Sequence, residues 1–174
     1  MSSISIEQEL AGIPTRFPVV VLMQSEPSRD NTWSDYQWRA IGVMARQTED
    51  AELGEPQLVH ENDEIKKYLY SGFVINLYTD ECESYYYNLI SDEPHCYVIT
   101  RQDTSGVPIP FQVSMSFDEA NAYLESDEDV YVVDVPPEIY RWTEAFVLMH
   151  YAPEQRKKRK RDNWKQHGES EVNP

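Results

Sequence analysis

Apolar residues in the first half of the chain fall in short runs that polar and turn-forming residues separate. Such runs, rich in Val, Ile and Tyr, are typical of β-strands, because branched and aromatic side chains fit a pleated surface. We predict strands at residues 17–23, 37–46, 67–76, 84–90 and 96–101. Residues 24–34 hold turn formers and are expected to be a loop, and the acidic stretch 49–64 an exposed excursion with a short strand at 57–60.

The period of the pattern changes in the second half. Apolar Phe111, Val113 and Met115 alternate with polar residues, which predicts a half-buried strand. Ser116, followed three positions later by Glu119, forms a capping-box pattern and predicts a helix to about residue 126. We expect Phe117, Ala120 and Leu124 to share one face of that helix.

A further strand is predicted at residues 130–135, followed by a second helix with Pro137 near its first position. Ile139, Trp142, Phe146 and Met149 form an apolar stripe along this helix, which Pro153 ends. The fold class expected is α+β. Its antiparallel sheet of six to seven strands should be strongly curled, or a partly closed barrel, with two helices in the C-terminal half.

Charge divides the chain into an acidic body and a basic end. The formal net charge is −16, yet the last 19 residues carry 7 Lys and Arg against 3 Asp and Glu. We expect a flexible leader at residues 1–16, one domain at 17–153 and a charged, disordered tail at 154–174. The tail holds six consecutive basic residues: Arg156, Lys157, Lys158, Arg159, Lys160 and Arg161.

The candidate catalytic patterns are weak. The six glycines stand apart from one another, so no phosphate-binding loop is expected. The cluster Asp92, Glu93, His95 and Cys96 contains metal-ligand types, but its spacing fits no zinc pattern, and a hairpin turn beside a buried thiol is favoured. His95 and Cys96, adjacent on a strand, would point to opposite faces. We predict no catalytic residue, no metal site and no cofactor.

The two cysteines and the lack of a targeting pattern bear on location. No apolar run approaches the about 20 residues that a membrane span needs, and the first 16 residues lack a signal-peptide pattern. We therefore expect a cytoplasmic protein with Cys82 and Cys96 as free thiols.

Aromatic residues offer a possible contact surface. Tyr85, Tyr86 and Tyr87, with Trp33 and Trp38, could form a platform for a ligand or partner, although strand aromatics usually pack in the core. Trp33 is the strongest candidate because its segment is predicted to be a loop.

Several segments together resemble a known family. They include Phe17-Pro18-Val19-Val20-Val21, residues 31–35 with Trp33, residues 38–43, residues 86–89, the helix at 119–124, Val135-Pro136-Pro137 and residues 158–162. Over residues 17–162 the chain is similar to a family of uncharacterised bacterial proteins. Members are often encoded near genes for molybdenum-dependent formate dehydrogenase and are sometimes labelled molybdopterin-guanine dinucleotide biosynthesis proteins. The Gly-rich nucleotide loop of a guanylyltransferase is missing, so the resemblance implies only an association with this pathway.

The function expected is therefore that of a non-catalytic accessory protein. Its partner would be a subunit or assembly factor of formate dehydrogenase, which the basic residues 156–161 and Trp33 would contact. One alternative is an enzyme or carrier acting on a molybdopterin-type cofactor. Another is weak nucleic-acid binding through the tail, which the charge of the acidic body disfavours.

Overall fold

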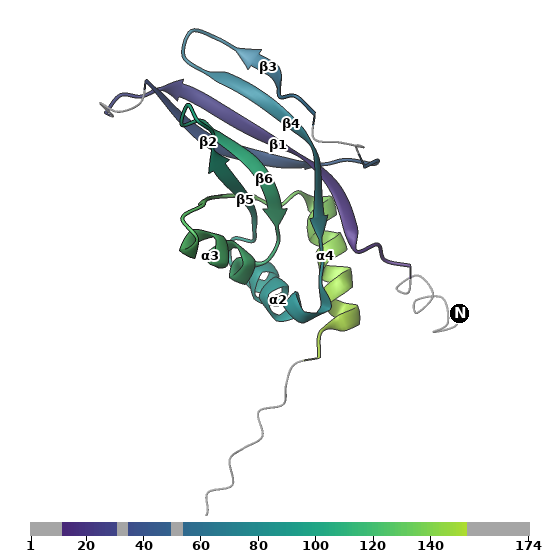
Figure 1. Cartoon of the computed structure of the whole chain (residues 1–174). Coiled ribbons are helices and arrows are strands. Elements are labelled where there is room, and N and C mark those ends of the chain that lie inside the picture. The colour runs from purple at the N-terminus through teal and green to yellow at the C-terminus, as the bar shows by residue number, and fades with distance from the viewer. Residues whose placement is uncertain (1–11, 31–34, 50–53, 153–174) are drawn as a thin grey trace, which may run out of the picture.

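The computed structural model describes residues 12–30, 35–49 and 54–152. These residues form seven strands, three α-helices and one short 3-10 helix (Figure 1). In chain order they are β1 (Arg16–Pro27), β2 (Tyr36–Ala45), β3 (Gln57–Glu61), β4 (Lys66–Asn76), η1 (Thr79–Glu81), α2 (Cys82–Ile90), β5 (His95–Gln102), β6 (Pro108–Ser114), α3 (Phe117–Glu125), β7 (Asp129–Asp134) and α4 (Pro137–His150).

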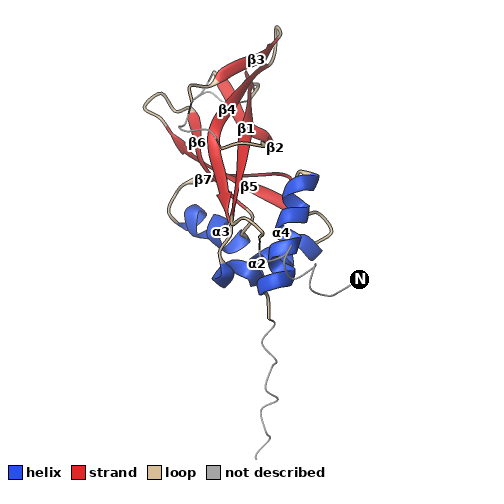
Figure 2. Ribbon diagram, turned by 90° about the vertical axis from the view of Figure 1, so that its right-hand side faces the viewer, coloured by secondary structure: helices blue, strands red, loops and turns tan. Residues whose placement is uncertain are grey.

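The strands form two antiparallel sheets. The larger has the order β2-β1-β4-β3 and the smaller the order β6-β5-β7. The sheets meet where β4 lies against β6 and β2 against β7. The helices gather at one end of the molecule, while the larger sheet extends away from them (Figure 2). The α+β class is thus confirmed.

The predicted strongly curled sheet or partly closed barrel is wrong, because the strands divide into two sheets. The chain leaves β4 through η1 and α2 before it enters β5, so no hairpin joins these two strands. With β5 free of β4, it pairs with β6 on one side and β7 on the other. The helical connection therefore separates the sheets.

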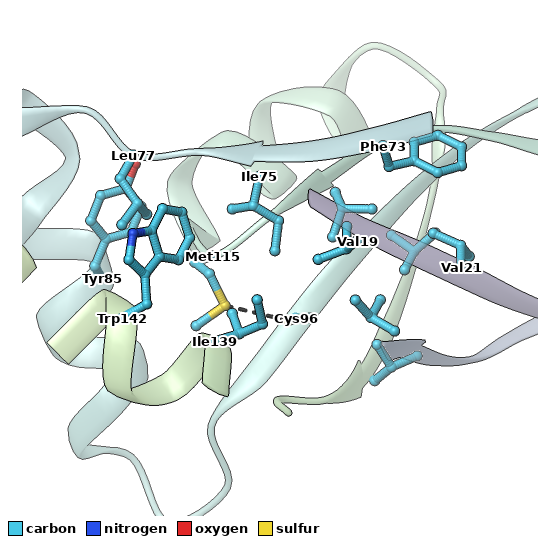
Figure 3. Packing of buried hydrophobic residues seen from close by; sticks show 14 of the residues in the cluster. Val19, Val21, Phe73, Ile75, Leu77, Tyr85, Cys96, Met115, Ile139 and Trp142 are labelled. Atoms are coloured by element: carbon cyan, nitrogen blue, oxygen red, sulfur yellow. Dashed lines mark hydrogen bonds between the residues drawn. The ribbon is translucent and has the colours of Figure 1, made fainter. Parts of the chain in front are cut away.

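One main core fills the space between the sheets and two of the helices. Val19 and Val21 of β1, Cys96 of β5, Met115 after β6 and Trp142 of α4 all belong to it (Figure 3). A smaller core joins Tyr97 and Ile99 of β5 to Ala120 of α3. Because β5 is buried on both faces, its middle residues 96–99 form a continuous apolar run.

The prediction of a strand at residues 84–90 is wrong, because these residues belong to α2. Cys82, Tyr85 and Leu89 are all buried, and their spacing of three and four positions places them on one face of a helix. The Tyr85 hydroxyl accepts a hydrogen bond from the Tyr78 amide at 3.0 Å, which anchors the start of the helix. Burial of this helix face outweighs the high strand propensity of three consecutive tyrosines.

The other predicted strands are confirmed, with changes at their ends. β1 runs on to Pro27, so the predicted loop begins later. Its residues Gln24 and Ser25 are buried although they are polar. β6 begins at Pro108, three residues before Phe111, where the predicted alternating pattern begins. β3 forms at the edge of its sheet, and all five of its residues are exposed.

Both predicted helices are confirmed, but their buried faces differ from the expected ones. In α3 only Ala120 is buried, whereas Phe117 and Leu124 are exposed. In α4 Ile139, Trp142 and Phe146 are buried as predicted, and Val147 is buried in place of Met149. The buried face of α4 is therefore rotated slightly about the helix axis from the predicted apolar stripe.

The segment before β1 is tied to α4 and β4. The indole of Trp142 donates a hydrogen bond to the Pro14 carbonyl at 2.6 Å, and the Leu77 amide donates to the Thr15 carbonyl at 2.9 Å. Within the described ranges, no helix has the length and apolarity needed to cross a membrane.

Candidate functional site

The N-terminal ends of α2 and α3 meet above β5 and leave a groove of about 570 Å³ between them. We name it the α2–α3 groove. It is lined by Glu83, Ser84, Tyr87, Asn88, Ser91, Glu93, His95, Tyr97, Phe117 and Asp118. It lies at the helical end of the molecule, where α2 and α3 are neighbours in both views (Figures 1 and 2).

Asn88 fixes α2 against the smaller sheet. Its side-chain amide donates hydrogen bonds to the carbonyls of His95 at 2.8 Å and Met115 at 3.0 Å. Its carbonyl oxygen accepts from the His95 amide at 3.0 Å. All three bonds reach backbone groups, and Asn88 is buried. One side chain therefore holds a helix, the start of β5 and the end of β6 together.

A chain of hydroxyl groups joins the start of α2 to the start of α3. Ser116, the N-cap of α3, accepts a hydrogen bond from the Glu119 amide at 3.1 Å and donates to a Glu81 carboxylate oxygen at 2.6 Å. The Ser84 hydroxyl lies 3.2 Å from that of Ser116 and accepts from the Asp118 amide at 3.2 Å. These bonds fix the distance between the two walls of the groove.

The predicted capping box forms only in half. The Ser116 hydroxyl caps the helix, but the Glu119 carboxylate accepts hydrogen bonds from Gln112 and from the Ser114 hydroxyl instead of reaching back to the Ser116 amide. That amide donates to the Ser114 hydroxyl at 3.0 Å. Ser114 therefore relays between the two groups that a capping box would join directly.

The surface of the groove combines aromatic rings with carboxylates. Tyr87 and Phe117 are 57% and 56% exposed, and Phe117 packs edge-on against Tyr97 with ring centroids 6.3 Å apart. Glu83, Glu93 and Asp118 make no ion pair with any described residue. Exposed aromatic rings beside unpaired negative charges suit a partner that brings both apolar and cationic groups.

His95 adds a polar group to the groove. Its Nδ1 atom is buried and has no hydrogen-bond partner among the described residues. Buried polar atoms are usually paired. The fold therefore leaves one buried hydrogen-bonding atom of His95 unsatisfied beside the groove.

Both cysteines are free and buried. Burial raises the pKa of the Cys96 thiol to about 12, and burial with the nearby Asp80 charge raises that of Cys82. Cys96 donates a weak hydrogen bond to the Met115 sulfur at 3.4 Å (Figure 3). Since the thiolate is the nucleophile, both thiols are unsuited to that role at neutral pH.

The structure divides the cluster Asp92, Glu93, His95 and Cys96. Cys96 points into the main core, whereas Glu93 and His95 line the groove. Within residues 12–30, 35–49 and 54–152, no three His, Cys, Asp or Glu side chains are placed to hold one metal ion.

A second cleft, of about 720 Å³, lies at the far end of the larger sheet. Its lining includes Glu26, Arg29, Asp30, Trp38 and Tyr131. The Tyr131 hydroxyl donates to the Trp38 carbonyl at 3.4 Å across the two sheets. This cleft carries charges of both signs and borders residues 31–34, which the structure does not describe.

The predicted partner-binding residues fall outside the described part of the chain. Trp33 lies within 31–34, and Arg156, Lys157, Lys158, Arg159, Lys160 and Arg161 lie within 153–174.

The three tyrosines do not form one platform. Tyr85 is buried, Tyr86 is half-buried against Tyr151, and only Tyr87 faces the groove.

Sequence reasoning did not find the α2–α3 groove because it assigned residues 84–90 to a strand. Helical spacing contains the missing signal. If Cys82, Tyr85 and Leu89 form the buried face, Glu83 and Tyr87, four positions apart, fall together on the opposite face. An acidic residue and an aromatic residue side by side on an exposed helix face would have marked the site.

A family model described as a protein of unknown function, DUF3305, matches residues 18–161. This range includes every element that forms the groove. No curated protein and no solved structure matches the chain.

Proposed function

We propose that this chain, which belongs to the DUF3305 family of proteins of unknown function, is a non-catalytic accessory protein that binds another protein through the α2–α3 groove. The observation that carries the proposal is the pair of half-exposed rings, Tyr87 and Phe117, beside the unpaired carboxylates of Glu83, Glu93 and Asp118. Exposed aromatic groups in a groove are typical of protein-binding surfaces.

The chemistry of the groove favours binding over reaction. Neither cysteine lines it, and its three carboxylates belong to exposed residues. A molybdopterin-type cofactor and a nucleic acid both bring phosphate groups, which these carboxylates would repel. A partner segment with cationic and apolar side chains meets no such repulsion.

The partner proposed is a subunit or assembly factor of formate dehydrogenase in the cytoplasm. The support for this choice is the resemblance to proteins encoded near formate dehydrogenase genes. In the same proposal, Trp33 and the basic residues 156–161 make additional contacts with an acidic surface of the partner.

The test measures binding of purified formate dehydrogenase subunits and their assembly factors to the full-length chain. The variants Tyr87→Ala and Phe117→Ala are compared with Leu148→Ala on α4, which is 75% exposed and outside the groove. We expect each groove variant to weaken binding about 10-fold or more, since a central aromatic contact contributes about 2 kcal/mol. Leu148→Ala should bind as the wild type does.

Equal affinity of all three variants would exclude the groove as the binding surface. No binding of any formate dehydrogenase component to the wild type would exclude the proposed partner. Circular dichroism of each variant serves as the folding control, because both rings are more than half exposed and their removal should leave the core intact.

A further inference from the structure

We infer that the α2–α3 groove binds the basic segment of this same chain, residues 156–161, and so is covered by the protein's own tail when no partner is bound. The inference rests on the proposed function, because it assigns a regulation to the same groove. It follows from three features: where the described chain ends, which charges lie there, and how far the remaining residues reach.

The described chain ends beside the groove. Tyr151 stacks on Tyr86 of α2 with ring centroids 4.9 Å apart and planes inclined by 26°. Tyr86 in turn contacts Tyr87, a residue of the groove wall, at 5.5 Å between centroids. Partial burial and the nearby Tyr87 and Glu83 raise the pKa of Tyr151. Residue 152 thus lies next to one wall of the groove.

The charges of the two parts are complementary. The groove presents Glu83, Glu93 and Asp118 without an ion-pair partner in the described ranges. The tail presents six cations in succession. Long Lys and Arg side chains can also lay their methylene groups on the rings of Tyr87 and Phe117 and keep their charged ends at the edge. The same groove therefore accepts both parts of such a side chain.

The length of the connecting chain permits the contact. An extended chain spans at most about 3.5 Å per residue, so residue 156 can reach at most about 14 Å from residue 152, and residue 161 at most about 30 Å. A short tether gives a high effective concentration, and a weak electrostatic contact can then compete with binding in trans. A partner would have to displace the tail, which makes its binding dependent on salt and on the tail.

Zero-length crosslinking of the full-length chain tests the inference. A carbodiimide joins a lysine amine to a carboxylate only where the two are in contact, and mass spectrometry identifies the linked peptides. We expect Lys157, Lys158 and Lys160 to link to Glu83, Glu93 and Asp118 at least five-fold more than to Asp63 and Glu64, which lie in the β3–β4 turn. The difference should disappear at about 0.5 M salt.

Two variants give the matched comparison. Glu83→Gln with Glu93→Gln removes two charges from the groove, and Asp63→Asn with Glu64→Gln removes two from the β3–β4 turn. The first should lower crosslinking of the tail to Asp118 several-fold, and the second should leave it unchanged. Linkage spread evenly over the acidic body, or unaffected by the first variant, would overturn the inference.

Two further measurements identify which chain supplies the tail, and distinguish failure of this inference from failure of the proposed function. Links between labelled and unlabelled chains in a mixture would identify the tail of a second copy and overturn the intramolecular assignment. If the tail does not link to the groove while Tyr87→Ala still weakens partner binding, the inference fails and the proposed function stands. If the tail links to the groove and no partner binds the full chain or a tail variant with Lys157, Lys158 and Lys160 changed to Gln, the proposed function fails.

Discussion

At the scale of single residues, polar side chains with several partners hold the groove in shape. Asn88 joins α2 to the backbone of β5 and to the residue after β6, and Ser116 joins the starts of two helices. Both residues are buried. A buried polar group stabilises the fold only while its partners are present, so these two positions should tolerate substitution poorly.

Asn88→Ala should lower the free energy of unfolding by about 3 kcal/mol, because it leaves two carbonyls and one amide without their partner in a buried place. Urea unfolding of the full chain measures the change. Asn121→Ala on α3 is the control, since that exposed side chain donates a hydrogen bond to Glu125 and its loss should change stability by less than about 0.5 kcal/mol. A loss at Asn88 as small as that at Asn121 would contradict the structural role.

At the scale of elements, a helix with a local capping signal was predicted correctly, and one without such a signal was not. The helix after Ser116 was predicted from a local signal, the spacing of Ser116 and Glu119, and it forms where that signal stands. The element at residues 84–90 has no side-chain cap, and its strand-prone tyrosines led to the wrong prediction. Only its contacts with α4 and the core determine the helix, as with Tyr85 against Phe146 at 6.3 Å.

Ser116→Ala should destabilise the chain more than the loss of an ordinary N-cap, by about 2 kcal/mol, because the hydroxyl also satisfies the Glu81 carboxylate. The matched control is Ser126→Ala at the other end of α3, where the exposed hydroxyl donates to the Ala122 carbonyl only. We expect the control to cost less than about 0.5 kcal/mol in the same urea titration. Equal losses at both serines would exclude a special role for the cap.

At the scale of the whole molecule, one core connects both sheets with α2 and α4, and it contains both thiols. Cys82 and Cys96 come from α2 and β5, so their burial depends on the assembled structure and not on either element alone. Their reactivity consequently reports on the integrity of the core.

Both thiols should react with an aromatic disulfide reagent at pH 8 only as fast as the chain unfolds. Burial raises the pKa of Cys96 to about 12 and that of Cys82 above its usual value, so at this pH the folded protein holds almost no Cys96 thiolate and less Cys82 thiolate than an exposed cysteine would. Unfolding in urea returns both pKa values to normal and should release two equivalents at once. Rapid modification of either thiol in the native chain would contradict the assigned burial.

Some features of the fold depend on neighbouring residues, and others depend on contacts between residues far apart in the chain. Strands with strong alternation or branched residues, such as β1 and β4, were predictable, because each carries its own pattern. The pairing of β5 with β7, and the division into two sheets, depends on contacts between distant residues. The full lining of the groove was beyond prediction for the same reason, since it comes from α2, β5 and α3, and only Glu83 and Tyr87 on α2 carried a local signal.

The sequence by itself determined the α+β class, most strands, the two later helices, and the opposition of an acidic body to six consecutive cations. These properties reside in neighbouring residues, where period, capping and charge act locally. The tertiary structure decided that residues 82–90 form a helix, that the strands form two sheets, and that Tyr87, Phe117 and three carboxylates share one groove. Burial of one helix face against a distant core sets where the opposite face points, and no local pattern encodes that direction.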